Sequence, residues 1–236
     1  MSANVLCPPP ARRPRSAPVG SLARPRSRAD ATINGEGSTE DGFYIFGLDT
    51  AAVFQPAVDD TQWTRFAALS GNQEPRRYGA TAVIGKLIYC IGGRTQTNAV
   101  SDRIDVFNTT SRTWNTGPTL PDPRWGHSAA AYDGKIYVFG GRLGNGPVSN
   151  SVQELNPGTA QWVDKAEMPE AWEGMSTGPM PTYANGEVII PHAYKPNRGV
   201  ATALKYDIRA DSWEAGPSIA YRAGRYAVAF GTYDEE

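Results

Sequence analysis

The sequence predicts an all-β protein in which a four-stranded unit is repeated about four times. Gly and Pro account for 25 and 19 of the 236 residues, a frequency typical of short strands joined by turns rather than of a helical bundle. An apolar run followed by Gly-Gly-Arg occurs twice, with the glycine pairs 48 residues apart. Spacings of 51, 48 and 51 residues separate four tryptophans, Trp63, Trp114, Trp162 and Trp213. Such a regular period indicates a repeat architecture.

The unit is clearest in residues 79–94 and 126–142. Each segment begins with small residues and continues through a hairpin into an apolar run that ends in Gly-Gly-Arg. A Trp follows 21 residues after the second glycine in both copies. A large apolar or aromatic residue stands seven positions before the Trp in three copies, as Phe107, Leu155 and Tyr206. These marks recur together, so the set is far more specific than a single Gly-Gly pair.

Each unit is expected to contain four strands. In the unit at about 76–119 they are predicted at 80–83, 87–91, 103–107 and 112–114. Asp133-Gly134 and Asn185-Gly186 are tight-hairpin signals between first and second strands. Further units are expected at about 124–169 and 175–219. One such sheet cannot bury both of its faces, so neighbouring units must stack.

Two copies depart from this pattern. In the third unit the apolar run 188–190 is followed by Pro191-His192-Ala193, where a Gly-Gly pair is expected. Residues 42–63 supply only second to fourth strands, and residues 225–230 resemble a first strand. These two fragments are complementary, so their pairing would close a ring of four units. An open arc and a piece of a larger ring are the alternatives, and an open edge is prone to association.

These features resemble the kelch repeat, whose units are the blades of a β-propeller. The resemblance covers about residues 42–233. It implies a kelch-type β-propeller of about four four-stranded blades, either closed and four-bladed or incomplete. In such a fold the glycine pair permits a positive φ and close backbone approach, and the recurrent aromatic residues fill the layers between blades.

Residues 1–41 are expected to be a disordered leader rich in Arg, Pro and Ser, and residues 42–236 to form the propeller. The first 30 residues hold six arginines and one acid, Asp30, without an apolar period. An organelle transit peptide and a nucleic-acid-binding arm are the alternative interpretations. A cytoplasmic location is predicted, and organellar targeting by a transit peptide is the alternative.

Signals for catalysis are few, so a binding module is expected rather than an enzyme. His127 and His192 have no Cys or His at metal-ligand spacing, and no metal or cofactor is predicted. Cys7 and Cys90 make no disulfide framework. The net charge of −1 gives no general footprint for nucleic acid or a membrane surface. Some kelch-type proteins are enzymes, so a small enzyme or sugar-binding protein resembling sialic-acid epimerases is the alternative.

The resemblance implies a ligand face built from the loop after each glycine pair and the loop before each first strand. The positions that match in this sequence are Arg94, Arg142, Tyr194 and Lys195 for the first loop, and Arg77, Tyr78, Arg124, Trp125, Arg225 and Tyr226 for the second, with Glu173 in the third copy. Arginine donates forked hydrogen bonds to carboxylates, and arginine with aromatic residues is typical of interaction hot spots. The alternative for each arginine is an internal ion pair.

The predicted function is therefore a non-catalytic protein-interaction scaffold that binds a partner protein, with an acidic segment as the favoured target. No nucleic-acid or membrane partner is predicted. Self-association through open propeller edges is a further expectation.

Overall fold

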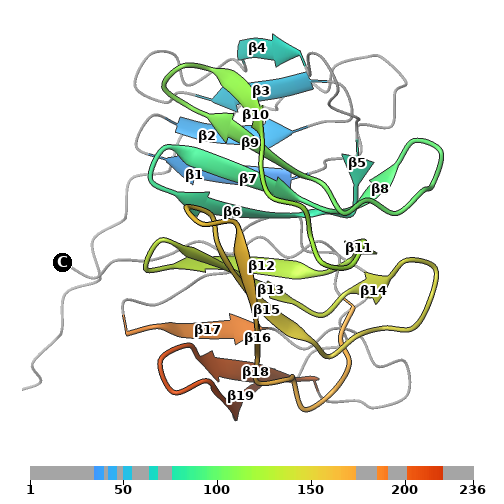
Figure 1. The fold of residues 1–236 in the computed structure, drawn as a ribbon. Helices are drawn as coiled ribbons and strands as arrows, with labels where there is room; N and C mark the ends of the chain where they lie inside the picture. The colour runs from blue at the N-terminus through green and yellow to red at the C-terminus, as the bar shows by residue number, and fades with distance from the viewer. Residues whose placement is uncertain are drawn as a thin grey trace, which may run out of the picture. The chain divides into compact units, whose positions relative to one another are not determined.

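The computed structural model describes the strands at 35–39, 42–46, 50–54 and 64–68, followed by residues 76–173, 185–190 and 201–219 (Figure 1). Strands and turns make up this part of the chain, and the four main sheets are antiparallel. The predicted all-β fold class is confirmed. No helix that could cross a membrane is found among these residues.

The first sheet is complete within the N-terminal part of the chain. It has the order β1-β2-β3-β4, with strands β1 (Gly35–Thr39), β2 (Gly42–Phe46), β3 (Thr50–Phe54) and β4 (Thr64–Ala68). Only second to fourth strands were predicted here, and residues 35–39 were predicted to belong to the disordered leader, so both predictions are wrong at this strand. The sequence Gly-Glu-Gly-Ser-Thr has no apolar alternation, and the strand is recognisable only from its backbone pairing with β2. Residues 1–34 and 225–230 lie outside the described residues.

The second and third sheets each contain four strands, close to the predicted ranges. The second sheet consists of β6 (Ala80–Ile84), β7 (Leu87–Ile91), β9 (Ile104–Asn108) and β10 (Thr113–Thr116). The third consists of β12 (Ser128–Tyr132), β13 (Lys135–Phe139), β15 (Val152–Asn156) and β16 (Gln161–Lys165). The hairpin at Asp133 and Gly134 has φ values of 48° and 70°, which is the left-handed conformation expected of such a two-residue turn.

The fourth sheet has three described strands, β17 (Glu187–Ile190), β18 (Ala201–Asp207) and β19 (Ser212–Ile219). Its predicted first strand falls in residues 174–184, outside the described part of the chain. The described residues thus contain four successive main sheets, and the number of blades stays a prediction. Closure of the ring stays a prediction.

Two layers of apolar side chains join neighbouring sheets. Along β12 and β13 the side chains alternate between them: Ala129 and Ile136 belong to the layer shared with the second sheet, whereas Ala130 and Tyr137 belong to the layer shared with the fourth. This two-sided burial explains why the central strands are continuously apolar. The repeated tryptophans pack at the margins of these layers, Trp162 in the first and Trp213 in the second.

The glycine pairs connect each sheet to the next. Gly92 and Gly140, the first glycines of the pairs, have φ values of 56° and 59°. The N–H groups of the second glycines, Gly93 and Gly141, donate hydrogen bonds of 2.8 Å to the carbonyl oxygens of Arg124 and Trp172. Both acceptors lie in the segment that leads into the following sheet, so these hydrogen bonds attach each glycine pair to the start of the next unit.

Candidate functional site

Two small two-stranded sheets extend beyond the ends of the second and third sheets. Strand β8 (Arg94–Thr95) pairs with β5 (Arg76–Arg77), and β14 (Arg142–Leu143) pairs with β11 (Arg124–Trp125) (Figure 1). The registers place Arg77 opposite Arg94 and Trp125 opposite Arg142. The loop after each glycine pair therefore lies beside the segment that precedes the first strand, as the resemblance implies.

On these two small sheets, several side chains contact the ring of Trp125. The guanidinium carbon of Arg94 lies 4.3 Å from the centroid of the Trp125 ring, and that of Arg142 lies 5.8 Å away. The Tyr78 ring is 5.9 Å from the same indole, and Arg77 lies over Tyr78 at 5.4 Å. These five half-buried residues are called the arginine–tryptophan cluster below. Stacking of a guanidinium on an indole face is a favourable cation–π contact that holds both groups in place.

The three arginines of the cluster have different acceptors. Arg94 Nη2 donates to the side-chain oxygen of Asn145 at 2.9 Å, and Arg77 donates to the side-chain oxygen of Asn98. Both acceptors are neutral amides. Arg142, in contrast, donates to the carbonyl oxygen of Gly146 at 2.9 Å and to Oε2 of Glu173 at 2.8 Å. Among the described residues, Arg142 alone of these three faces a carboxylate.

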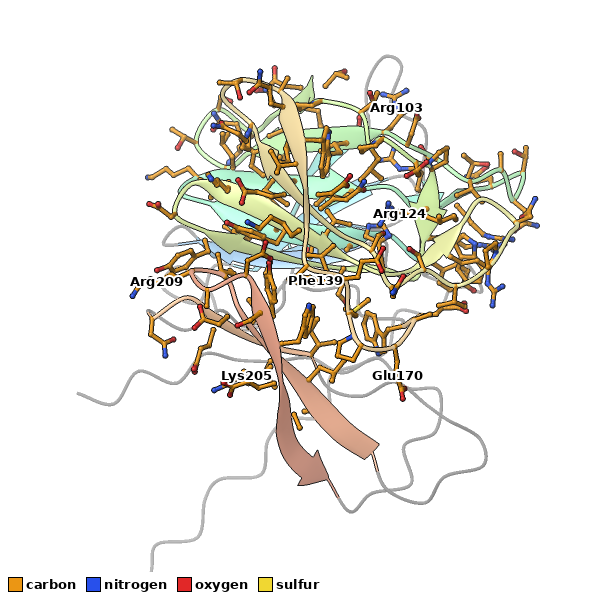
Figure 2. The ribbon with its side chains drawn as sticks, turned by 60° about the horizontal axis from the view of Figure 1, so that its bottom comes forward. Arg103, Arg124, Phe139, Glu170, Lys205 and Arg209 are labelled. Carbon is orange, nitrogen blue, oxygen red and sulfur yellow. The ribbon has the colours of Figure 1, made fainter. Side chains whose placement is uncertain are left out.

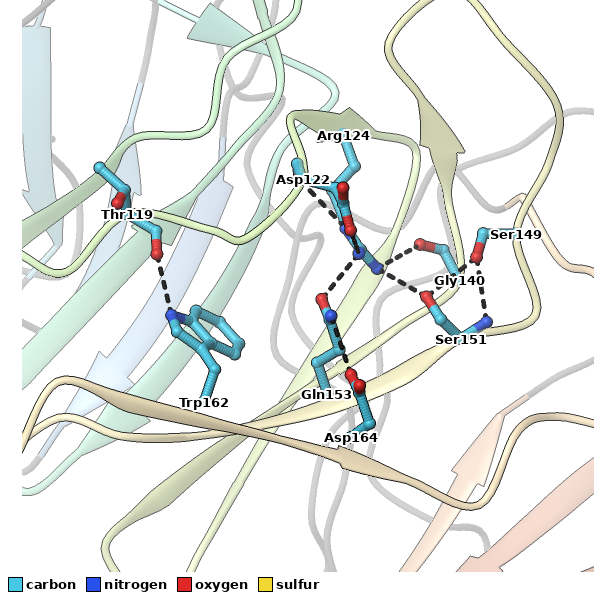
Figure 3. A network of polar contacts seen from close by, with 9 residues as sticks. All are labelled: Thr119, Asp122, Arg124, Gly140, Ser149, Ser151, Gln153, Trp162 and Asp164. Atoms are coloured by element: carbon cyan, nitrogen blue, oxygen red, sulfur yellow. Dashed lines mark hydrogen bonds and ion pairs between the residues drawn. The ribbon is translucent and has the colours of Figure 1, made fainter.

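Arg124 does not belong to the exposed cluster, and its prediction as a ligand-binding residue is wrong. Its side chain is 0% exposed and donates to Gly140 O and Ser151 Oγ at 3.2 Å and to Gln153 Oε1 at 2.7 Å (Figure 3). Asp122 Oδ2 lies 3.7 Å from its Nη2. Burial lowers the pKa of Arg124, with partial compensation from Asp122. The guanidinium thus connects structural elements and presents no surface to a ligand.

The prediction treated Arg124 as the equivalent of Arg77, which is one residue out of register. Arg76 and Arg124 each stand 16 positions before the glycine whose carbonyl they contact, so they are equivalent. Arg76 is also buried and forms a 2.6 Å ion pair with Asp105. The counterpart of Arg77 is consequently Trp125, not Arg124.

Four predicted ligand-binding residues are not described, and the candidate reactive groups His127 and Cys90, which were not predicted as site residues, are buried. Tyr194, Lys195, Arg225 and Tyr226 lie outside the described residues. His127 is fully buried, and burial together with the charge of Arg124 lowers its pKa to about 3. Cys90 is also buried, which raises the pKa of its thiol to about 12. Neither residue is accessible to a substrate.

Sequence reasoning missed the amides of Asn98 and Asn145. Both residues are exposed and lie in the loops that follow Arg94 and Arg142 respectively. They are not equivalent in the 48-residue repeat, in which Asn98 matches Gly146 and Asn145 matches Thr97, so the repeat pattern did not point to them. Within the described part of the chain, no three His, Cys, Asp or Glu side chains converge as a metal site would require.

Comparison with known proteins identifies the repeat. A family model described as the KLHDC2/KLHL20/DRC7 kelch-repeats domain matches residues 25–231. An F-box/kelch-repeat protein of Arabidopsis thaliana is 34% identical over 76 residues, which make up 32% of this chain and 18% of that protein. The chain thus matches less than a fifth of the length of this relative.

A solved structure, that of YjhT, has the same fold. It superposes with a TM-score of 0.62 at 19% sequence identity, and the superposition covers 80% of this chain and 66% of that one. The family match extends over most of the sequence, including all of the described sheets. This protein therefore belongs to the kelch-repeat family of β-propellers.

Proposed function

We propose that this propeller is a non-catalytic interaction module that binds an acidic segment of a partner protein at the arginine–tryptophan cluster. Kelch-repeat domains generally bind protein partners. The observation that carries the proposal is the stack of Arg94 on Trp125 at 4.3 Å, with Arg142 beside the same ring. A guanidinium fixed by an aromatic face retains donors along its edge, and these match the two oxygens of a carboxylate.

The charge of the surroundings supports an acidic ligand. Residues 1–30 carry a formal charge of +5 and the whole chain −1, so residues 31–236 carry −6. Within this acidic domain, Arg77, Arg94 and Arg142 lie around the rings of two aromatic side chains. Glu173 neutralises the charge of Arg142. Arginine and aromatic side chains in one half-buried patch are the usual composition of a binding hot spot.

The test compares two arginine variants in the full chain. Arg94→Ala removes the stacked guanidinium, and Arg209→Ala is the matched control. Arg209 also stacks on an aromatic ring, 5.7 Å from that of Tyr132, and donates to the Tyr132 hydroxyl at 2.8 Å. Figure 2 shows Arg209 at the left edge of the molecule and Arg124 to the right of its centre, so the control alters a similar contact away from the two small sheets.

The probe is a short fluorescent peptide rich in Glu and Asp, compared with its Gln and Asn counterpart by fluorescence anisotropy. Arg94→Ala is expected to weaken binding of the acidic peptide about ten-fold, as loss of a hot-spot side chain does. Arg209→Ala is expected to bind like the parent. Binding should also weaken with salt, because exposed charges are screened over about 10 Å at 0.1 M. Equal losses in both variants, or none in Arg94→Ala, would contradict the proposal. The basic leader is present in every sample and cannot produce a difference.

A further inference from the structure

We propose that Glu173 is an internal competitor in the arginine–tryptophan cluster: it occupies Arg142, so that the cluster recognises a single carboxylate, through Arg94. This inference rests on the proposed function and defines the ligand class more narrowly. It predicts a partner segment with one acidic side chain at the cluster rather than a run of acidic residues.

The repeat register shows why Glu173 holds this place. Arg77, Trp125 and Glu173 follow one another at intervals of 48 residues and are equivalent in successive units. The arginine after a glycine pair reaches across to this position in the following unit. Arg94 reaches Trp125 and lies on its ring, whereas Arg142 reaches Glu173 and forms an ion pair at 2.8 Å. One structural position thus offers an aromatic face at the first junction and a carboxylate at the second.

The two guanidinium groups consequently differ in what they leave for a ligand. Arg94 uses Nη2 for the exposed amide of Asn145, and its face is covered by Trp125. No negative side chain among the described residues neutralises it. Arg142 uses both terminal nitrogens, Nη1 for Gly146 O and Nη2 for Glu173. A carboxylate that approached Arg142 would have to displace Glu173 or lie against its negative charge.

The contact between Arg142 and Glu173 is accessible enough for such competition. Their side chains are 33% and 26% exposed, so the pair lies at the surface and not in the core. Partly exposed ion pairs contribute little to folding, and they can be exchanged for contacts with a ligand. Like charge at close range, however, disfavours a second anionic group, which makes Glu173 a specificity-determining residue.

The experiment uses the full chain and two fluorescent peptides of equal length in a Ser and Gln background, one with a single Glu and one with two adjacent Glu residues. The parent is expected to bind both with similar affinity. Glu173→Gln should bind the two-Glu peptide about five-fold more tightly, the effect of one partly exposed charge contact, and leave the one-Glu peptide unchanged within about two-fold. Gln keeps an oxygen that can accept a hydrogen bond from Arg142, so the structure around Arg142 is expected to be retained. Glu173→Ala is the second variant for the same measurement.

Arg142→Ala completes a double-mutant cycle. Arg142 belongs to the cluster, so its own effect on each affinity is first measured in the parent; combined with Glu173→Gln, Arg142→Ala should abolish the gain that Glu173→Gln alone produces. The inference is overturned if Glu173→Gln and Glu173→Ala leave the two-Glu peptide unchanged, or if the gain persists without Arg142. In either case, a loss of binding in Arg94→Ala would leave the proposed function standing. Failure of the parent and of every variant to bind either peptide would overturn both.

Discussion

Nη1 of Arg76 lies 2.6 Å from Oδ2 of Asp105, and both side chains are buried within the second blade. Arg76 Nε also donates to the carbonyl oxygen of Gly92 at 2.8 Å, so the guanidinium links the glycine pair to strand β9. In the third blade Arg124 performs the same function with a different partner. Gln153 replaces the aspartate, and its Nε2 donates in turn to Asp164 on the outermost strand.

These two blades should respond differently when the partner of the arginine is removed. Asp105→Ala leaves Arg76 buried without its carboxylate, and we expect a loss of about 3–5 kcal/mol in the free energy of unfolding. Gln153→Ala should cost about 1–3 kcal/mol, because it removes a neutral hydrogen-bond partner. Arg124 would keep its contacts with Ser151 and Asp122. Chemical denaturation of both variants measures the difference, and a larger cost for Gln153→Ala would contradict this account.

The glycine pair can be tested with two glycines of similar backbone conformation. Gly140 and Gly144 have φ values of 59° and 54°, but a Cβ on Gly140 would lie 2.5 Å from Trp172 O, whereas one on Gly144 meets nothing within 4 Å. Gly144→Ala should therefore cost about 1–2 kcal/mol, for the left-handed conformation alone. Gly140→Ala adds a backbone clash at the junction with the next blade, and about 2–5 kcal/mol is expected. Equal melting temperatures for the two variants would show that the clash relaxes without cost.

The repeated tryptophans also join consecutive blades. Trp162 Nε1 donates to Thr119 O at 2.8 Å, and Trp213 Nε1 donates to Ala166 O at the same distance. Trp162→Ala removes this bond and the packing of the indole against the first apolar layer, and should cost about 3 kcal/mol. Trp162→Phe retains much of the packing and should cost about 1 kcal/mol for the hydrogen bond. Denaturant unfolding of both variants checks the order, and equal costs would contradict the packing contribution.

Much of the fold was predictable because its signals are local in the sequence. The apolar runs, the hairpin at Asp133 and Gly134 and the glycine pairs each fix backbone conformation within a few residues, and the strand positions are confirmed. The residues seven positions before the tryptophans, Phe107 and Leu155, are fully buried. Strand β1 was not predicted because Gly35–Thr39 has no apolar pattern, and its pairing with β2 is made by backbone groups alone.

The site was predictable only in part, because burial of a charged residue depends on partners far along the chain. Arg124 has the residue type of a surface ligand-binding group, yet its acceptor Gln153 is 29 residues away. Glu173 neutralises Arg142 across 31 residues. Local composition gives no access to such contacts, although they decide which arginines face solvent. Cytoplasmic localisation and self-association through open edges stay predictions.

His127 should make the stability of the propeller depend on pH. Its side chain is fully buried beside Gly92. Burial, together with the charge of Arg124, lowers its pKa to about 3. In the unfolded chain a histidine has a pKa of about 6.5. Between these values the unfolded state binds a proton that the folded state excludes. The free energy of unfolding should therefore fall with decreasing pH, by up to about 1.4 kcal/mol per pH unit below about 6.5.

Denaturant unfolding between about pH 7 and pH 5 isolates this effect, because most carboxylates stay ionised over that range. His127→Gln keeps a polar side chain of similar size but cannot take up the proton, so its stability should change less over the same interval. His192 is present in both proteins and cancels in the comparison. Parallel pH dependences of the parent and His127→Gln would contradict the prediction. A parent that became more stable on acidification would contradict it as well, because the folded state would then bind more protons than the unfolded state.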